Sequence, residues 1–311
     1  MEMEQEINYF SDGYKLWARL ELPPGYKTGE KRPALVECPG FRHGAADPKA
    51  MPGDFKGTYN VNESLLKAGY IILSPHCRGF GKSQGRPGFA EAPHTRLNPF
   101  DQVEDMRNAI TWLAQRPEVD ANQIGVFGYS YGGALAPYVA AVDHRVKACV
   151  GALGVGNGER WMRSLRRDWE FQEFRQRVEA DLRQQTLTGK PEYVNPLDIM
   201  VPDPDSAKRG GALTDTPIGR MRFTLDSAHY IMRFHPAEVA HEIACPVMLI
   251  GAEKDALCPV EDYRRVYDAA PEPKEWVLIP GAAHYGTYAP EYVQKLVEPV
   301  TRWFKRWMPV K

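Results

Sequence analysis

A serine lies between two glycines in the pentapeptide Gly-Tyr-Ser-Tyr-Gly at residues 128–132. The mostly apolar residues 123–127 predict a short buried strand, and the small residues 133–141 predict a helix packed closely on a sheet. A serine in so sharp a turn has strained backbone angles, and the flanking glycines let neighbouring backbone approach it. The pattern predicts that Ser130 presents its hydroxyl as a nucleophile. Taken alone, the pentapeptide is also typical of a glycine-rich turn without chemistry.

A nucleophilic serine needs a general base, and the base needs an acid that holds its tautomer. Of eight histidines, only His284 follows the last predicted strand, in a loop of small residues. Asp255 follows the strand predicted at 246–250. The chain order serine, aspartate, histidine is the one expected when such residues follow successive strand ends. We therefore predict a catalytic set of Ser130, Asp255 and His284, with Glu253 as the weaker rival for the acid.

Acyl chemistry also needs hydrogen-bond donors for the oxygen that becomes negative. Tyr131 follows the nucleophile at a helix start, where its backbone N–H is otherwise unpaired and the helix dipole favours an anion. Phe41, in the loop after a predicted strand, is the expected second backbone donor. Tyr129 and His43 are candidates to contact the substrate, and for His43 a solvated loop position is the alternative.

These residues need elements that bring them together, and the sequence predicts an α/β fold. Strands that alternate with helices of 10 to 15 residues are typical of a mainly parallel, doubly wound sheet. Two leading segments around a Ser-Asp-Gly turn predict an antiparallel hairpin. The predicted strands are 6–10, 14–22, 34–38, 70–74, 123–127, 146–152, 246–250 and 276–279, and the predicted helices are 62–68, 99–115, 133–141, one after residue 259, and 291–307.

The alternation stops between residues 154 and 234, where a helical pattern over 160–183 precedes a stretch rich in proline and glycine. We predict that residues 154–234 form an inserted helical cap, and that residues 1–153 and 235–311 form the core domain. The aromatic residues of the cap recur at helical spacing, which favours a helix packed on the main domain. The alternative is that some of them cover a substrate site, and Trp161 is the candidate.

Composition favours some classes of partner over others. The chain has 311 residues, of which 43% are hydrophobic and 25% charged, and a formal net charge of −1. This balance gives no electrostatic reason to expect nucleic acid or an anionic membrane as a partner, and a small molecule fits better. Neither a leader pattern nor a long apolar run is present, so we expect a cytoplasmic protein with no membrane segment. A homo-oligomer is compatible with all of this.

Neither a metal site nor a phosphate-binding loop is predicted. The five cysteines are scattered and form no C-x-x-C pair, which argues against a disulfide framework and a zinc site. The glycine-rich loop at 75–85 lacks the spacing of a phosphate-binding loop. We expect a structural loop there, in which Arg78 binds neighbouring carbonyls or a carboxylate.

Together these motifs resemble the α/β-hydrolase superfamily over nearly the whole chain except the cap. The loop at 78–85, the stretch at 235–239 and the Pro-Gly-Ala-Ala-His ending at 280–284 are similar to dienelactone-hydrolase-like esterases and to the Xaa-Pro dipeptidyl peptidase and cocaine esterase group. The resemblance implies an α/β-hydrolase fold and a serine acyl-enzyme mechanism without a cofactor. Phe41 stands where that group supplies a tyrosine hydroxyl, and a dienelactone hydrolase proper has cysteine at the position of Ser130.

The predicted function is hydrolysis of a carboxylic ester of a small, partly apolar substrate. The same three residues would serve an amidase or peptidase, or the hydrolysis of a carbon–carbon bond in a diketone, and the sequence does not separate these. A noncatalytic binding protein of the same fold is the alternative from another class, and the intact set of Ser130, Asp255 and His284 argues against it.

Overall fold

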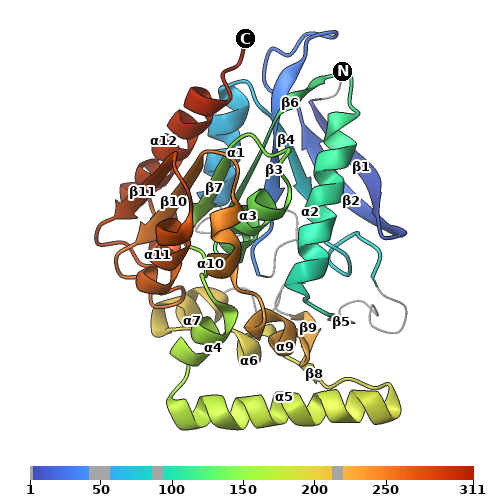
Figure 1. Cartoon of the computed structure of the whole chain (residues 1–311), viewed down its shortest axis with the longest axis vertical. Helices are drawn as coiled ribbons and strands as arrows, with labels where there is room; N and C mark the ends of the chain where they lie inside the picture. Colours follow the sequence, from blue (N-terminus) through green and yellow to red (C-terminus); the bar gives the residue numbers. More distant parts are fainter. Residues whose placement is uncertain (1–2, 42–56, 86–93, 212–219) are drawn as a thin grey trace.

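An eight-stranded sheet with the order β1-β2-β4-β3-β6-β7-β10-β11 forms the centre of the computed structural model (Figure 1). The structure describes residues 3–41, 57–85, 94–211 and 220–311. The pairs β1-β2 and β2-β4 are antiparallel, and the remaining neighbours are parallel. The strands are β1 (Glu4–Ser11), β2 (Tyr14–Glu21), β3 (Arg32–Cys38), β4 (Ile71–Pro75), β6 (Val119–Tyr129), β7 (Cys149–Ala152), β10 (Val247–Ala252) and β11 (Lys274–Ile279).

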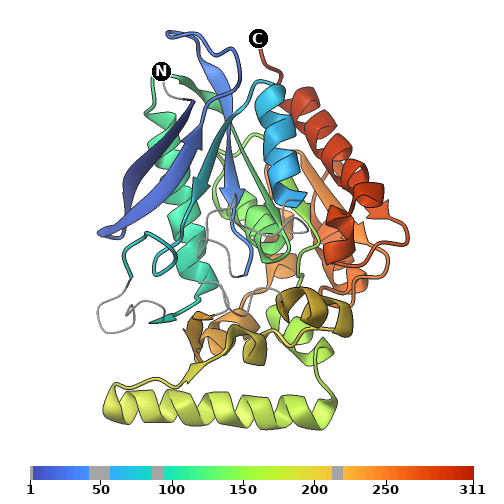
Figure 2. The same ribbon diagram turned by 180° about the vertical axis from the view of Figure 1, so that it is seen from behind.

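Helices cover both faces of this sheet, as the two opposite views show (Figures 1 and 2). One face carries α2 (Pro99–Ala114), α3 (Tyr131–Val142) and α11 (Val260–Ala269), and the other carries α1 (Gly57–Lys67) and α12 (Pro290–Trp307). Each face has its own cluster of buried apolar side chains. Because the inner strands are buried on both faces, they are continuous apolar runs, and every residue of β10 is buried. The predicted α/β-hydrolase fold is confirmed.

The segment of residues 154–234, between β7 and β10, lies beyond the carboxyl ends of the parallel strands, at the lower end of the molecule in Figure 1. It includes a small second sheet of order β5-β9-β8, in which one strand comes from before the segment. The elements around it are β5 (His94–Thr95), α4 (Gly158–Ser164), α5 (Asp168–Thr188), β8 (Tyr193–Val194), α6 (Pro196–Ile199), α7 (Pro204–Gly211), β9 (Arg222–Thr224), α9 (Ser227–Met232), α10 (Pro236–Val239) and the 3₁₀ helix η3 (Ala240–Glu242). The predicted domain boundaries remain a prediction.

The helical pattern predicted over residues 160–183 corresponds to two helices in the structure. Helix α4 ends at Ser164, and Arg167 has extended backbone angles (φ −68°, ψ 155°) before α5 begins. The Glu170 carboxylate accepts the Arg167 N–H at 2.7 Å, so a capping interaction stabilises this second start. Helical spacing of apolar residues continues across the break, which is why the pattern did not reveal it.

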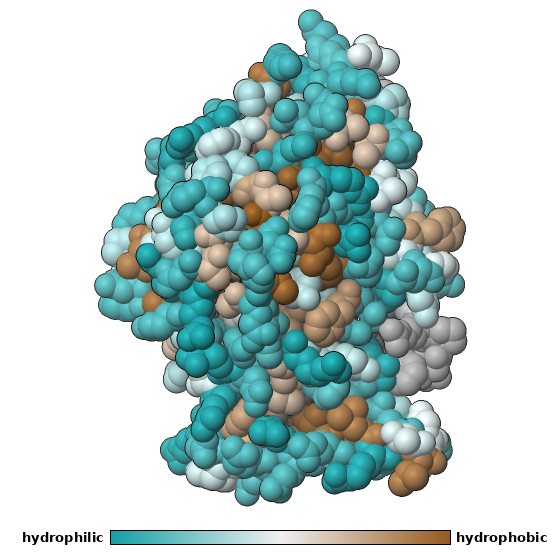
Figure 3. Space-filling view, viewed as in Figure 1, coloured by the Kyte–Doolittle hydropathy of each residue, from teal (hydrophilic) through white to brown (hydrophobic). Residues whose placement is uncertain are grey.

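The face in Figure 3 is mainly hydrophilic, with apolar residues in small separate groups. Large exposed apolar side chains include Trp169 and Leu187, which lie at opposite ends of α5. In the ranges that the structure describes, no helix combines the length and the hydropathy needed to cross a membrane.

Candidate active site

The turn between β6 and α3 holds Ser130 in strained backbone geometry. Its φ is +56° and its ψ is −127°, a combination of backbone angles that residues other than glycine rarely adopt. A Cβ atom at Gly128 would lie 2.2 Å from the Gly132 carbonyl oxygen, and one at Gly132 would lie 2.2 Å from the Cys38 carbonyl oxygen. The two glycines are therefore required by the close approach of backbone, as the pentapeptide pattern predicted.

His284 reaches this serine from the loop after β11. Its Nε2 lies 2.9 Å from the Ser130 Oγ and its Nδ1 lies 2.7 Å from Oδ2 of Asp255. The tautomer that serves both bonds carries its proton on Nδ1 and accepts the serine proton at Nε2. The Thr287 hydroxyl donates to the His284 carbonyl at 2.7 Å and fixes the start of the 3₁₀ helix η4 (Tyr285–Tyr288). The structure thus brings the three predicted residues into one hydrogen-bonded series.

Two backbone amides hold the buried carboxylate of Asp255. Its Oδ1 accepts the Leu257 N–H at 3.0 Å and the Cys258 N–H at 2.7 Å, while Oδ2 accepts from His284. Amide donors stabilise an ionised carboxylate inside a protein and fix its orientation. Sequence reasoning missed these donors, although an aspartate followed by a turn to Pro259 is the signal of a side chain that bonds backbone two and three residues on.

The rival acid, Glu253, bonds elsewhere. Its Oε2 accepts the Gly281 N–H at 2.7 Å, which ties the loop after β10 to the loop that leads to His284. A second tie joins the same loops, because the Lys254 N–H donates to the Ala282 carbonyl at 2.8 Å. Glu253 therefore contacts the histidine loop without contacting the imidazole.

The predicted backbone donors lie on either side of the nucleophile turn. Tyr131 is the first residue of α3, so its N–H is among the groups that a helix leaves without an internal partner. Phe41 follows β3, whose carbonyl at Cys38 touches Gly132, and the Phe41 and Tyr131 rings meet edge to face at 5.9 Å between centroids. His43 lies outside the described residues.

The other two candidates for substrate contact are buried. Tyr129 is 3% exposed and packs edge to face against Phe127 on the α1 and α12 side of the sheet, and burial raises the pKa of its hydroxyl well above the ordinary value. Trp161 is 2% exposed and its indole Nε1 donates to the Leu257 carbonyl at 2.8 Å. Its ring also meets Phe41 edge to face at 6.0 Å.

A group of aromatic side chains next to the predicted donors joins the sheet to the segment at 154–234. Phe41 packs on Phe223 of β9 at 5.3 Å between ring centroids, and Phe223 packs on Phe80 at 5.8 Å. Sequence reasoning missed Phe80 and Phe223, since nothing in their local pattern distinguishes them from core residues. They make the surroundings of this site apolar.

Asp255, Cys258 and His284 also have the residue types of a metal site, and their ligand atoms lie within 4.8 Å of one another. The donor set does not fit a metal ion. The Asp255 and His284 atoms already bond each other at 2.7 Å, and burial raises the pKa of the Cys258 thiol well above its ordinary value, which disfavours the thiolate that a metal would require.

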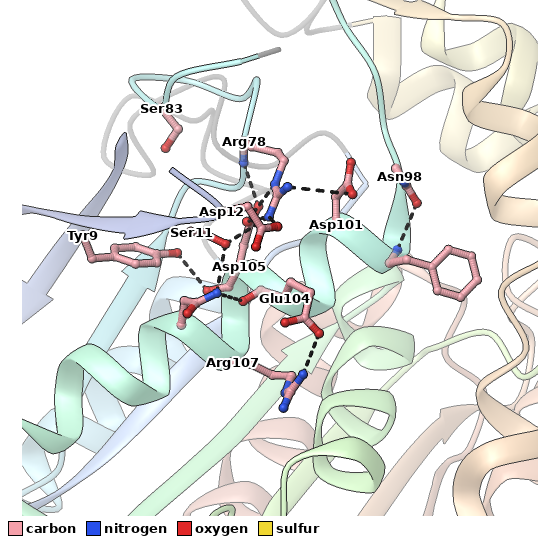
Figure 4. A network of polar contacts seen from close by, with 12 residues as sticks. Tyr9, Ser11, Asp12, Arg78, Ser83, Asn98, Asp101, Glu104, Asp105 and Arg107 are labelled. Atoms are coloured by element: carbon pink, nitrogen blue, oxygen red, sulfur yellow. Dashed lines mark hydrogen bonds and ion pairs between the residues drawn. The ribbon is translucent and has the colours of Figure 1, made fainter. Parts of the chain in front are cut away.

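Arg78 forms the network in Figure 4, on the α2 side of the sheet. Its Nε and Nη2 donate to Oδ1 of Asp105 at 2.9 and 2.6 Å, and Nη2 also donates to Ser11 and Asp12 at 3.0 and 2.9 Å. Tyr9 donates to the Asp105 carbonyl at 3.1 Å. The loop after β4, helix α2 and the β1-β2 hairpin are joined at this point. The predicted structural role of Arg78, binding a carboxylate, agrees with these contacts.

The sequence of the chain matches one protein family model over most of its length. Residues 12–286 match the model of the X-Pro dipeptidyl-peptidase (S15) family. The chain belongs to the S15 family. This S15-family protein is an enzyme of the α/β-hydrolase type, as its fold and the resemblance of its motifs indicated.

Two relatives and one solved structure show what this S15-family protein is similar to. An uncharacterized 31.7 kDa protein of Escherichia coli is 27% identical over 282 residues, which cover 89% of this chain and 91% of that protein. A polyketide transferase of Aspergillus fumigatus is 26% identical over 247 residues, covering 74% and 77%. The crystal structure of the α/β hydrolase GrgF from Penicillium has a TM-score of 0.75 at 23% identity, and the match covers 98% of this chain and 99% of that one.

Proposed function

We propose that this protein cleaves carboxylic esters through an acyl-enzyme intermediate on Ser130. The observation that carries the proposal is the hydrogen-bonded series from Ser130 Oγ through His284 to the buried Asp255, with bonds of 2.9 and 2.7 Å. Such a series is the arrangement that makes a serine hydroxyl nucleophilic at neutral pH. A noncatalytic binding protein has no need of it.

In the first half of the reaction, His284 Nε2 takes the serine proton while Oγ forms a bond to the acyl carbon. The substrate carbonyl becomes an oxyanion, which accepts from the Tyr131 and Phe41 backbone N–H groups in this proposal. The imidazolium then gives its proton to the leaving oxygen as the carbon–oxygen bond breaks. Asp255 keeps the imidazole in the required tautomer and stabilises its positive form.

In the second half, a water molecule gives its proton to His284 and attacks the acyl carbon. The carbon–Oγ bond breaks, the serine recovers its proton and the carboxylic acid leaves. An amide substrate would use the same groups, with the proton going to the leaving amine.

We further propose that residues 154–234 act as a cap over the acyl group, between core segments 1–153 and 235–311. The supporting contacts are those of Phe41 with Trp161 and with Phe223, both of which belong to the inserted segment. These rings and the burial of Tyr131 favour a partly apolar acyl or leaving group.

Acyl transfer to an acceptor other than water is the second candidate. The name of the Aspergillus fumigatus relative, a polyketide transferase, favours it, because transferase and hydrolase chemistry share the acyl-enzyme and differ in the group that attacks it. Added alcohols or thiols would distinguish them. Transfer predicts that ester or thioester products replace the free acid at low acceptor concentration.

The test of the proposal uses p-nitrophenyl esters and a fluorophosphonate probe. Ser130→Ala should lower ester turnover by roughly 10⁴-fold or more while the fold remains intact, because the nucleophile is lost. The probe should add to Ser130, as peptide mass spectrometry would show. Normal turnover by Ser130→Ala, or labelling at another residue, would overturn the assignment.

The two neighbouring acids provide a matched pair for the role of Asp255. Asp255→Asn should lower turnover roughly 10²- to 10⁴-fold, since the amide favours the wrong histidine tautomer. Glu253→Gln keeps an acceptor for the Gly281 N–H and should cost far less. An equal loss in both variants would contradict the assignment of Asp255.

A further inference from the structure

A continuous line of hydrogen bonds runs from Trp161 in the inserted segment to the nucleophile. The indole N–H of Trp161 donates to the Leu257 carbonyl at 2.8 Å. The same peptide group carries the Cys258 N–H, which donates to Asp255 Oδ1 at 2.7 Å. From Asp255 the line continues through His284 to Ser130. Trp161 is therefore one peptide group away from the predicted catalytic acid.

The peptide group between Leu257 and Cys258 is planar, so a bond at its carbonyl fixes the direction of its N–H. If this unit rotated, the N–H would point away from Asp255 Oδ1, and the carboxylate could turn away from the imidazole. A donor on the carbonyl also polarises the amide and strengthens the bond at the other end. Trp161 can thus act on the carboxylate without contacting it.

The bond is well placed to do so, because the tryptophan is buried and the start of its helix is held firmly. Asn157 caps α4 by accepting the Arg160 N–H at 3.0 Å. A Cβ atom at Gly158 would lie 1.7 Å from the Ile231 carbonyl oxygen, so α4 lies directly on α9. The indole has little room for another rotamer.

A second set of hydrogen bonds joins the start of the inserted segment to the region that follows Asp255. Asp262 Oδ2 accepts the backbone N–H groups of Gly156 and Asn157 at 2.9 and 3.1 Å, and Oδ1 accepts from Arg160 at 3.3 Å. Asp262 lies in the first turn of α11, a few residues after the acid. The start of the inserted segment is therefore fixed at two points, one in the loop of residues 253–259 that carries Asp255, here called the acid loop, and one in the helix that follows it.

We infer that Trp161 is a positioning residue that sets the orientation of Asp255 through the peptide group of Leu257 and Cys258. The inference rests on the proposed function, since it assigns Trp161 a part in the same acyl chemistry. It also differs from the sequence-based prediction that Trp161 contacts the substrate. The two roles affect different kinetic constants, because a positioning residue acts on kcat and a contact residue acts on KM.

The experiment compares two tryptophans. Trp161→Phe removes the N–H and should lower kcat for a p-nitrophenyl ester about 3- to 10-fold with KM nearly unchanged, the size expected from one hydrogen bond. Trp303→Phe is the matched control, because Trp303 is also 2% exposed and its indole nitrogen has no hydrogen-bond partner among the described residues. That control should keep the normal kcat.

If Trp161→Phe fails to fold, replacement of Trp161 by benzothienylalanine keeps the ring shape and removes only the N–H. The same fall in kcat is expected. The downfield proton resonance of the His284–Asp255 hydrogen bond should also shift in the Trp161 variants and stay in place in Trp303→Phe. A merely structural role for Trp161 would leave that resonance unchanged.

A double-mutant cycle with Asp255→Asn decides whether Trp161 acts through the acid. In that background Trp161→Phe should change kcat less than about 2-fold. An undiminished loss in the Asp255→Asn background, or a raised KM at normal kcat, would overturn the inference. These outcomes are separate from failure of the proposed function, which Ser130→Ala tests independently.

Discussion

At the scale of single residues, backbone atoms next to the nucleophile are packed so closely that an added side-chain carbon would not fit. Gly132 lies against the Cys38 carbonyl, and that carbonyl belongs to the strand that leads to Phe41. The nucleophile turn and the predicted oxyanion donors therefore share one close contact. A methyl group at this position would disturb both.

We accordingly expect Gly132→Ala to be costly. The new Cβ atom would lie 2.2 Å from the Cys38 oxygen, so backbone must shift, at a cost of about 1–3 kcal/mol in the free energy of unfolding. Ester turnover should fall about 10²-fold, because a displacement near 1 Å at a reacting group has that effect. Urea unfolding and steady-state kinetics measure the two changes.

Gly286→Ala is the control for this prediction. Among the residues that the structure describes, a Cβ atom there would meet the Ala283 Cβ alone, at an ordinary 3.8 Å. Its stability and turnover should stay close to those of the natural sequence. Equal behaviour of the two variants would show that the contact with Cys38 is unimportant.

The residues that could be predicted from the sequence are those with a fixed place relative to strand ends. Ser130, Asp255 and His284 each follow a strand whose apolar run is clear, so their order was informative. The hydrogen bond between Trp161 and Leu257 could not be predicted, because the two residues lie 96 positions apart and meet only through the tertiary fold.

At the scale of elements, Arg78 joins three parts of the core. It contacts Asp105 on α2 and Asp12 in the turn between β1 and β2, and it belongs to the loop after β4. The sequence indicated neighbouring carbonyls or a carboxylate as the partner of Arg78 without identifying it, since spacing alone does not select one acid among 40. The fold selects Asp105, whose carboxyl pKa is raised by burial although the Arg78 hydrogen bonds oppose this.

Removal of the Arg78 charge should therefore destabilise the core. Arg78→Met leaves the fully buried Asp105 without its ion pair, and we expect a loss of about 3–5 kcal/mol in the free energy of unfolding. Arg163→Met removes an exposed pair with Asp168 and should cost less than about 1 kcal/mol. Urea denaturation of both variants provides the comparison, and similar costs would contradict the importance of the network.

Two features of the inserted segment, a helix break and a small sheet, were not predicted from the sequence. At the break between α4 and α5, the Glu170 carboxylate accepts the Arg167 N–H, a local contact that helical periodicity does not reveal. The sheet β5-β9-β8 pairs strands of two or three residues from distant parts of the chain. Such short strands carry no period-two pattern.

At the scale of the whole molecule, the inserted segment and the acid loop should open together. Asp262 accepts two backbone N–H groups at the start of the segment, and Trp161 bonds the loop that holds Asp255. Loss of Asp262 leaves those amides without their acceptor and weakens the joint between the two parts. Local opening of this kind is measured by amide hydrogen exchange.

We expect Asp262→Ala to speed exchange about 10-fold in peptides from residues 155–164 and from 255–259, since one or two hydrogen bonds control the opening. Peptides from β6 should be unaffected, because the core sheet keeps its contacts. Asp268→Ala, in the same helix, removes only an exposed pair with Arg264 and should change neither region. Faster exchange confined to α11 would mean that the segment and the acid loop are not joined through Asp262.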